Sequence, residues 1–167
     1  MSIKPLTIEQ SRVLLNRSDE IIVRGCQGHK RSHDMLSMGY PVFTQRASGA
    51  RFWDVDGNEY LDFLCGLGPI TLGYNYKPVN EAAEEQLRKG VLFSLPHPIE
   101  LELSETIIDV IPNAEMVKFE KSGSNAVTAA VRVARYKTKR DKIAYCGSGG
   151  VWHDWQAAMV SRDSGIP

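Results

Sequence analysis

The sequence is poor in cysteine, has no excess charge of either sign and contains no long hydrophobic run. Lysine and arginine together number 20, as do aspartate and glutamate, so no net field draws the chain to nucleic acid or a membrane surface. No apolar segment reaches the ~20 residues that span a bilayer, and the N-terminus lacks a signal-peptide core. The three cysteines, Cys26, Cys65 and Cys146, are widely spaced, which predicts reduced thiols in a cytoplasmic protein.

Metal binding is not indicated by the residues that could supply ligands. Cys26, His29 and His33 have a spacing that could suit zinc, but no fourth ligand is evident nearby. The adjacent Lys30 and Arg31 would repel a cation, so a solvated loop is the favoured interpretation. The acidic turn 54–58 lacks the glycine and glutamate that a calcium loop needs at its sixth and twelfth positions.

Hydrophobic periodicity predicts helices over residues 7–23, 78–89, 98–111 and 126–136. In the first of these, Thr7 is suited to cap the helix. The expected apolar face of this helix consists of Val13, Leu14, Ile21 and Ile22.

Strands are predicted at 41–45, 51–55 and 59–63, where Asp56-Gly57-Asn58 forms a hairpin turn. Two buried strands are predicted at 116–119 and 142–146. Alternation of helix and strand in the second half indicates an α/β sheet with helical crossovers.

A small polar turn, Ser122-Gly123-Ser124-Asn125, lies between the strand predicted at 116–119 and the helix after it. The first amides of a helix lack internal partners, and the helix dipole favours negative charge there. Gly123 allows a ligand to approach the backbone, while Ser122 and Ser124 carry hydroxyl groups. The turn therefore predicts a phosphate site.

A glycine-rich loop, residues 147–150, follows the strand predicted at 142–146. Ligands of α/β sheets bind beyond the carboxyl ends of strands, so this loop and the turn at Ser122 could share one edge of a site. A nucleotide-binding Rossmann interpretation is less favoured, because the third glycine and a helical continuation are missing.

Several motifs, in the same order, resemble class III aminotransferases, and the glutamate-1-semialdehyde aminomutase type in particular. The resemblance covers roughly residues 40–167. The matching segments are Trp53–Phe63, Gly68-Pro69, Leu72-Gly73, Glu100–Glu105, Met116–Phe119, Ser122–Ala126 and Trp152–Trp155.

This resemblance implies a pyridoxal-phosphate enzyme of fold type I, with sites at the interface of a homodimer. It also implies that residues 1–64 belong to the small domain and residues 65–167 begin the large cofactor-binding domain, whose sheet would be incomplete. The expected activity moves an amino group between a small-molecule amino donor and a carbonyl acceptor. Leu67 stands where the aminomutase pattern usually has tryptophan, so a different substrate is expected.

By the same resemblance, the cofactor phosphate would be held by Ser122, Gly123, Ser124 and Asn125. The family pattern usually has threonine and glutamate at the last two positions. The ring-stacking aromatic residue falls at Gly149, so Trp152 is the remaining candidate to contact the cofactor ring. His97 and His153 are interpreted as structural rather than catalytic.

The Schiff-base lysine and the carboxylate for the pyridine nitrogen lie beyond the segment resembled, and residues 161–167 resemble a chain that stops within a loop. We therefore expect an N-terminal fragment, inactive alone and without catalytic residues of its own. The alternatives are a glutamate-1-semialdehyde 2,1-aminomutase, or a catalytically dead module that binds phosphate or pairs with an intact subunit.

Overall fold

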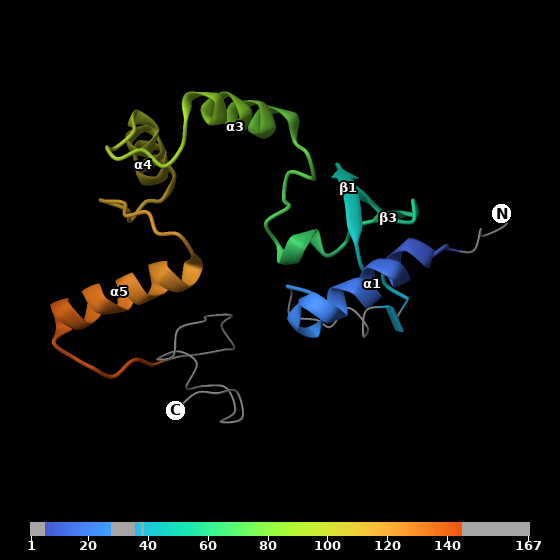
Figure 1. Cartoon of the computed structure of the whole chain (residues 1–167). Helices are drawn as coiled ribbons and strands as arrows, with labels where there is room; N and C mark the ends of the chain where they lie inside the picture. Colours follow the sequence, from blue (N-terminus) through green and yellow to red (C-terminus); the bar gives the residue numbers. More distant parts are fainter. Residues whose placement is uncertain (1–5, 28–35, 38, 145–167) are drawn as a thin grey trace. The chain divides into compact units, whose positions relative to one another are not determined.

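The computed structural model describes residues 6–27, 36–37 and 39–144 (Figure 1). The chain divides into two compact units, residues 1–92 and 93–167. The predicted boundary between residues 64 and 65, which would separate the small and large domains of the family fold, stays a prediction. No helix within the described ranges is long and apolar enough to cross a membrane.

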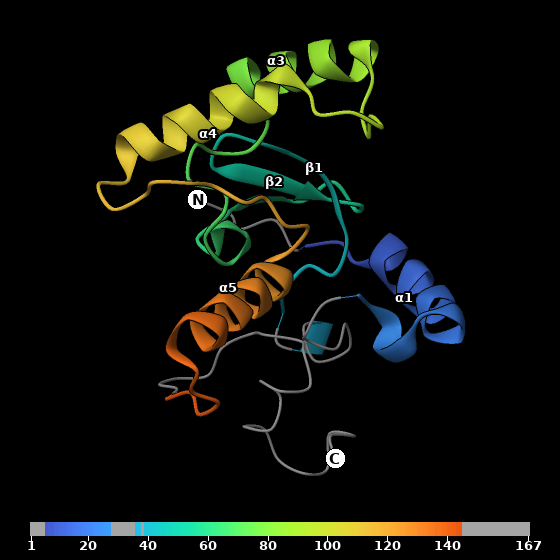
Figure 2. The ribbon, with the colours of Figure 1, turned by 90° about the vertical axis from the view of Figure 1, so that its left-hand side faces the viewer.

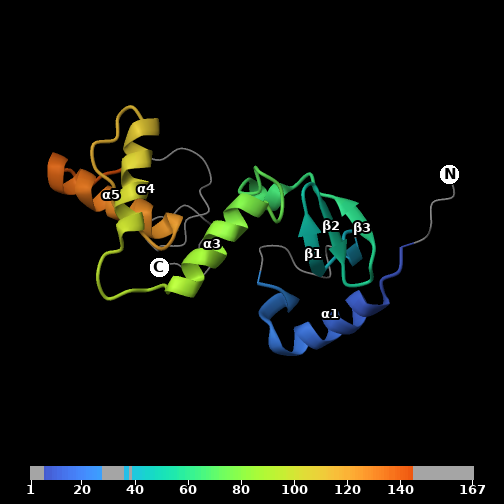
Figure 3. The same cartoon turned by 90° about the horizontal axis from the view of Figure 1, so that it is seen from above.

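The first unit contains an antiparallel three-stranded meander in the order β1-β2-β3. Its strands are β1 (Thr44–Ser48), β2 (Arg51–Asp54) and β3 (Glu59–Leu61). They lie side by side (Figure 3). Phe52 pairs with Tyr60 across β2 and β3, and the two rings stack with centroids 5.0 Å apart. The predicted hairpin is confirmed, although β1 begins three residues later than expected, at Thr44.

Helix α1 (Glu9–Ile21) buries a different face from the one its apolar residues predict. Ser11, Leu15 and Ser18 are buried, whereas Val13 and Ile21 are 61% and 73% exposed. The predicted apolar face is therefore wrong at Val13 and Ile21, whereas Leu14 and Ile22 are half-buried. The buried polar groups are satisfied locally, since the Ser18 hydroxyl donates to the Leu15 carbonyl at 2.9 Å and lies 3.1 Å from that of Gly25.

Thr7 does not cap α1, because the helix begins after Ile8 with no side-chain cap from its own segment. The Thr7 hydroxyl instead donates to the main-chain oxygen of Asp56 at 3.4 Å. After α1, the chain turns through η1 (Val23–Gly25), a short 3-10 helix that packs against it.

The segment that follows β3 is fixed by one carboxylate. Asp62 accepts hydrogen bonds from the amides of Leu64 and Cys65 at 2.8 and 3.1 Å, and from the Tyr74 hydroxyl at 2.7 Å. This segment includes η2 (Cys65–Leu67). Tyr74 also pairs with Gly49 through two main-chain hydrogen bonds, so the loop folds back onto the first hairpin.

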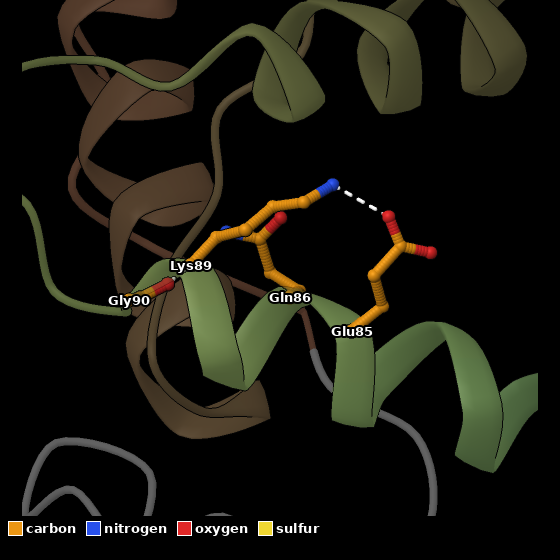
Figure 4. A network of polar contacts seen from close by, with 4 residues as sticks. All are labelled: Glu85, Gln86, Lys89 and Gly90. Atoms are coloured by element: carbon orange, nitrogen blue, oxygen red, sulfur yellow. Dashed lines mark hydrogen bonds and ion pairs between the residues drawn. The ribbon is translucent and has the colours of Figure 1, made fainter.

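Helix α3 (Lys77–Lys89) matches the predicted segment and has proline in its first turn. Its last turn carries an ion pair from Lys89 to Glu85, with Nζ and Oε1 2.6 Å apart (Figure 4). The Gln86 amide donates to the carbonyl of Gly90 at 3.0 Å. Both contacts suit a helix end, where carbonyls and the dipole favour donors and positive charge.

The second unit contains α4 (Pro98–Val110) and α5 (Gly123–Thr138), each a continuous helix (Figure 2). His97 caps α4 in a reciprocal box. Its Nδ1 accepts from the Ile99 amide at 3.2 Å, and its own amide donates to Glu100 Oε1 at 3.1 Å. These capping contacts give His97 the structural role that the sequence predicts.

The strand predicted at 116–119 does not form, and residues 142–144 are not in a strand either. A strand requires a neighbour to accept its ladder hydrogen bonds. Within the described residues, the only sheet is the meander of the first unit. Met116 is accordingly 91% exposed, although its side chain is typical of a buried position. The rest of the strand predicted at 142–146 lies outside the described residues.

Candidate functional site

Residues 122–125 form the N-cap and first turn of α5, which therefore begins at Gly123, three residues before the predicted start at 126. Ser122 is the N-cap in an extended conformation, and its hydroxyl oxygen accepts from the Asn125 amide at 3.2 Å. The same hydroxyl donates to the side-chain Oδ1 of Asn125 at 2.6 Å. The Ala126 amide bonds to the Ser122 carbonyl at 3.0 Å. Hence Ser122 and Asn125 hold each other and fix the direction in which α5 begins.

The space in front of Gly123 is open. A Cβ placed on this residue would meet no atom within 4 Å in the described part of the chain. Gly123 is the first helical residue of α5, and the first amides of a helix point out of its N-terminus. The open space at Gly123 therefore leaves room for an anion near these amides.

The charges around the turn also suit an anion. The first turn of α5 contains no acidic residue, so the helix itself places no carboxylate at the positive end of its dipole. Lys121 immediately precedes the cap. One wall of α5 forms a shallow groove lined by Glu120, Asn125 and Arg132. Its Glu120 and Arg132 carry opposite charges, and only the latter would attract a phosphate.

Four of the five predicted site residues are thus brought together: Ser122, Gly123, Ser124 and Asn125. Trp152 lies outside the described residues, as do the glycine loop 147–150 and His153. The expected pairing of the two loops at one sheet edge therefore stays a prediction. For the described residues, the donor set at α5 fits a phosphate group, since it combines outward amides, hydroxyl groups and open space.

Sequence reasoning missed a second polar centre, at the turn between β2 and β3. Asp54 is 1% exposed and accepts hydrogen bonds from the amides of Asp56 and Asn58. The Tyr60 hydroxyl also donates to it, at 2.9 Å. Burial, the hydrogen bond to Asp54 and the nearby negative charge raise the pKa of Tyr60 to about 12. The Asp-x-Asp-Gly-Asn pattern signalled a turn, but not that the first aspartate is buried within it.

The sequence profile of the family described as Aminotransferase class-III matches residues 33–159, about three quarters of the chain. The chain belongs to the class III aminotransferase family. The profile spans the turn at 122–125, and the family's enzymes depend on pyridoxal phosphate.

Curated relatives of this class III chain include both aminotransferases and aminomutases. It is 39% identical, over 163 residues, to 3-aminobutyryl-CoA aminotransferase of Cloacimonas acidaminovorans, and this match covers 97% of the chain and 38% of the relative. It is 38% identical, over 157 residues, to glutamate-1-semialdehyde 2,1-aminomutase of Acetivibrio thermocellus, covering 94% of the chain and 36% of the relative. The chain therefore spans little more than a third of these relatives.

A solved structure confirms the predicted fold type I. The PLP internal aldimine form of the FumI protein from Sphingopyxis sp. MTA144 matches with a TM-score of 0.71 at 34% identity. The match covers 77% of this chain and 31% of that protein. The sequence-based assignments of family, fold and cofactor class are confirmed at this level.

Proposed function

We propose that this class III chain forms part of an aminotransferase, and that its 122–125 turn holds the phosphate of pyridoxal phosphate. The whole protein would transfer an amino group from a small-molecule donor to a carbonyl acceptor, working as a homodimer without nucleic-acid or membrane partners. The observation that carries this proposal is the capped start of α5, with open space at Gly123 and no acidic residue in its first turn.

The roles of the site residues follow from their contacts. The amides of Gly123 and Ser124 would donate to the phosphate oxygens, with the α5 dipole adding to the attraction. The Ser122 hydroxyl now donates to Asn125, so it would rotate from this partner to contact a phosphate. Asn125 would keep the turn in place through its amide, which bonds to the Ser122 oxygen. When bound, the cofactor supplies an electron sink for carbanion chemistry.

Trp152 is proposed to contact the cofactor ring, as the resemblance implies. Within the class, we favour an aminotransferase of the aminomutase-like subgroup. The 38% identical aminomutase supports the alternative, a glutamate-1-semialdehyde 2,1-aminomutase. Leu67, in place of the usual tryptophan, argues for another substrate. We also propose that these 167 residues bind phosphate without catalysing transfer alone, since the family's lysine lies beyond the segment they match.

Equilibrium titration of the 167-residue chain with pyridoxal phosphate, and separately with pyridoxal, tests the phosphate site. We expect the phosphorylated form to bind more tightly, and inorganic phosphate to compete with it. Ser122→Ala and Ser124→Ala should each weaken binding of the phosphorylated form by about tenfold, the value of one hydrogen bond to a charged group. Binding of pyridoxal should change little.

Ser104→Ala is the matched control, because the Ser104 hydroxyl donates to the Glu100 carbonyl within α4, at 2.7 Å. Its affinity for pyridoxal phosphate should equal that of the unmodified chain. Equal affinities for the two cofactor forms, or equal losses in Ser122→Ala and Ser104→Ala, would contradict a phosphate site at this turn.

A further inference from the structure

Helix α1 is attached to the meander by a set of polar contacts centred on one carboxylate. Asp56 Oδ1 accepts from the Gln10 amide at 2.7 Å, and Oδ2 accepts from the amide and the hydroxyl of Ser11 at 3.0 and 2.5 Å. Asn58, in the same turn, donates from its side-chain amide to the Thr7 carbonyl at 2.7 Å. Asp56 thus caps a helix whose own N-cap residue, Ile8, has no side chain able to do so.

The apolar contribution to this attachment is small. The fully buried residues of α1 are Ser11, Leu15 and Ser18, of which only Leu15 is apolar, while Leu14 and the C-cap residue Ile22 are half-buried. Val13 and Ile21 face solvent. Because buried apolar area is the main source of packing energy, a helix with one buried leucine depends on its polar contacts to stay in place.

We propose that α1 is a strap fastened to the β2–β3 turn by Asp56, and that it opens as a unit while the meander stays folded. Local opening of this kind occurs where few apolar contacts hold an element to the rest of a domain. The meander has its own independent support, since cross-strand pairs join β1 to β2 and β2 to β3. Figure 3 shows α1 below the strands of the meander, and Gln10 and Ser11 make its contacts with the β2–β3 turn.

The electrostatics of Asp56 agree with this role. Burial by itself would raise the pKa of Asp56, but hydrogen bonds from Ser11 and Gln10 outweigh it, so that the pKa lies below its ordinary value. The Asp56 carboxylate is therefore charged at neutral pH, where it accepts the hydrogen bonds that hold α1 in place. The helix dipole contributes in the same direction, because Asp56 lies at its positive end.

Hydrogen exchange of single amides in the full 167-residue chain tests the proposal. In the unmodified chain, the Leu15 amide should exchange faster than the amide of Asp62, which bonds to the Ala50 carbonyl within the meander. Asp56→Asn replaces one of the two acceptor oxygens with a donor. It should speed exchange at Leu15 at least tenfold, while exchange at Asp62 changes less than threefold.

Glu59→Gln is the matched control, since it removes the same charge from β3, where Glu59 pairs with Arg51 and not with α1. It should leave exchange at Leu15 unchanged. Ser11→Ala removes only the hydroxyl contact and should speed exchange at Leu15 by about threefold, which provides a milder variant if Asp56→Asn fails to fold. Equal acceleration at Leu15 and Asp62 in either α1-contact variant, or none at Leu15, would overturn the strap.

Discussion

Asp54 should be among the most sensitive positions of the first unit, because one buried carboxylate satisfies four donors. Oδ1 accepts from the amides of Asp56 and Asn58 at 3.0 and 2.8 Å. Oδ2 accepts from the Asn58 side chain at 2.8 Å and from the Tyr60 hydroxyl at 2.9 Å. Asp54→Asn keeps one oxygen and loses the other, whereas Asp54→Ala loses both.

The expected losses follow from these contacts. A hydrogen bond to a charged group contributes about 1.5 kcal/mol or more. Asp54→Asn forfeits two such bonds and should lower the free energy of unfolding by about 3 kcal/mol. Asp54→Ala forfeits four, and because water can reach part of this turn we expect about 4–5 kcal/mol rather than the full sum. Against a typical total of about 5–15 kcal/mol, the alanine variant is close to unfolding.

Urea unfolding followed by tryptophan fluorescence measures these losses. Trp53 lies in β2 beside Asp54, so the Trp152→Phe and Trp155→Phe background leaves it as the one reporter of the three tryptophans in the sequence. Glu59→Gln is the control, since its pair with Arg51 is exposed and should contribute at most about 1 kcal/mol.

The result that would refute this reasoning is an Asp54→Asn variant no less stable than Glu59→Gln. It would mean that the carboxylate of Asp54 can be replaced by a neutral amide without loss, and that the network around it does not determine the stability of the hairpin. A graded series, in which alanine costs more than asparagine, supports the contact-by-contact account.

Two other perturbations test the same unit. The pKa of Tyr60, about 12 in the folded chain, exceeds its ordinary value of about 10. The contribution of Tyr60 to stability is therefore intact below pH ~10 and is lost as the pH rises towards ~12. The free energy of unfolding should fall more steeply at high pH than it does in Tyr60→Phe, and parallel curves would contradict this. Gly73 has φ +83°, and a Cβ there would lie 3.2 Å from the backbone of Gly49, so Gly73→Ala should cost about 2–3 kcal/mol in urea unfolding. Gly57 has φ +82°, but an added Cβ there meets no atom within 4 Å in the described residues. Gly57→Ala should therefore cost only the backbone strain of about 1 kcal/mol, and equal stability losses in Gly57→Ala and Gly73→Ala would exclude a clash at Gly73.

Much of the local structure could be predicted from the sequence because local signals determine it. The Asp-Gly turn predicted the hairpin, proline at position 78 and glycine at position 90 bounded α3, and the small polar turn at 122 predicted the start of α5. The candidate phosphate turn could be proposed from the sequence for the same reason, since its residues are consecutive. Trp152, predicted from resemblance, stays a prediction.

Non-local contacts were not predictable in this way. The face that α1 buries was predicted wrongly in part, because α1 contacts the rest of the unit through Ser11, which bonds to a carboxylate 45 residues further along the chain. The strand predicted at 116–119 has the right composition but lacks a hydrogen-bonded neighbour within the described residues. The composition of a segment gives it a preference for the strand conformation, but the hydrogen bonds that make it a strand come from a neighbouring segment.

The sequence by itself determined where the helices and turns fall, the family, and the polar turn at the start of α5, since each depends on neighbouring residues or consecutive motifs. Only the tertiary structure decided how the carboxylates are used. It buries Asp54 inside its own turn and brings Asp56 against the N-terminus of α1, where it accepts a hydrogen bond from Gln10. The physical reason is that an aspartate in a turn can accept hydrogen bonds from any nearby donors, and folding brings the Gln10 and Ser11 amides within reach of Asp56.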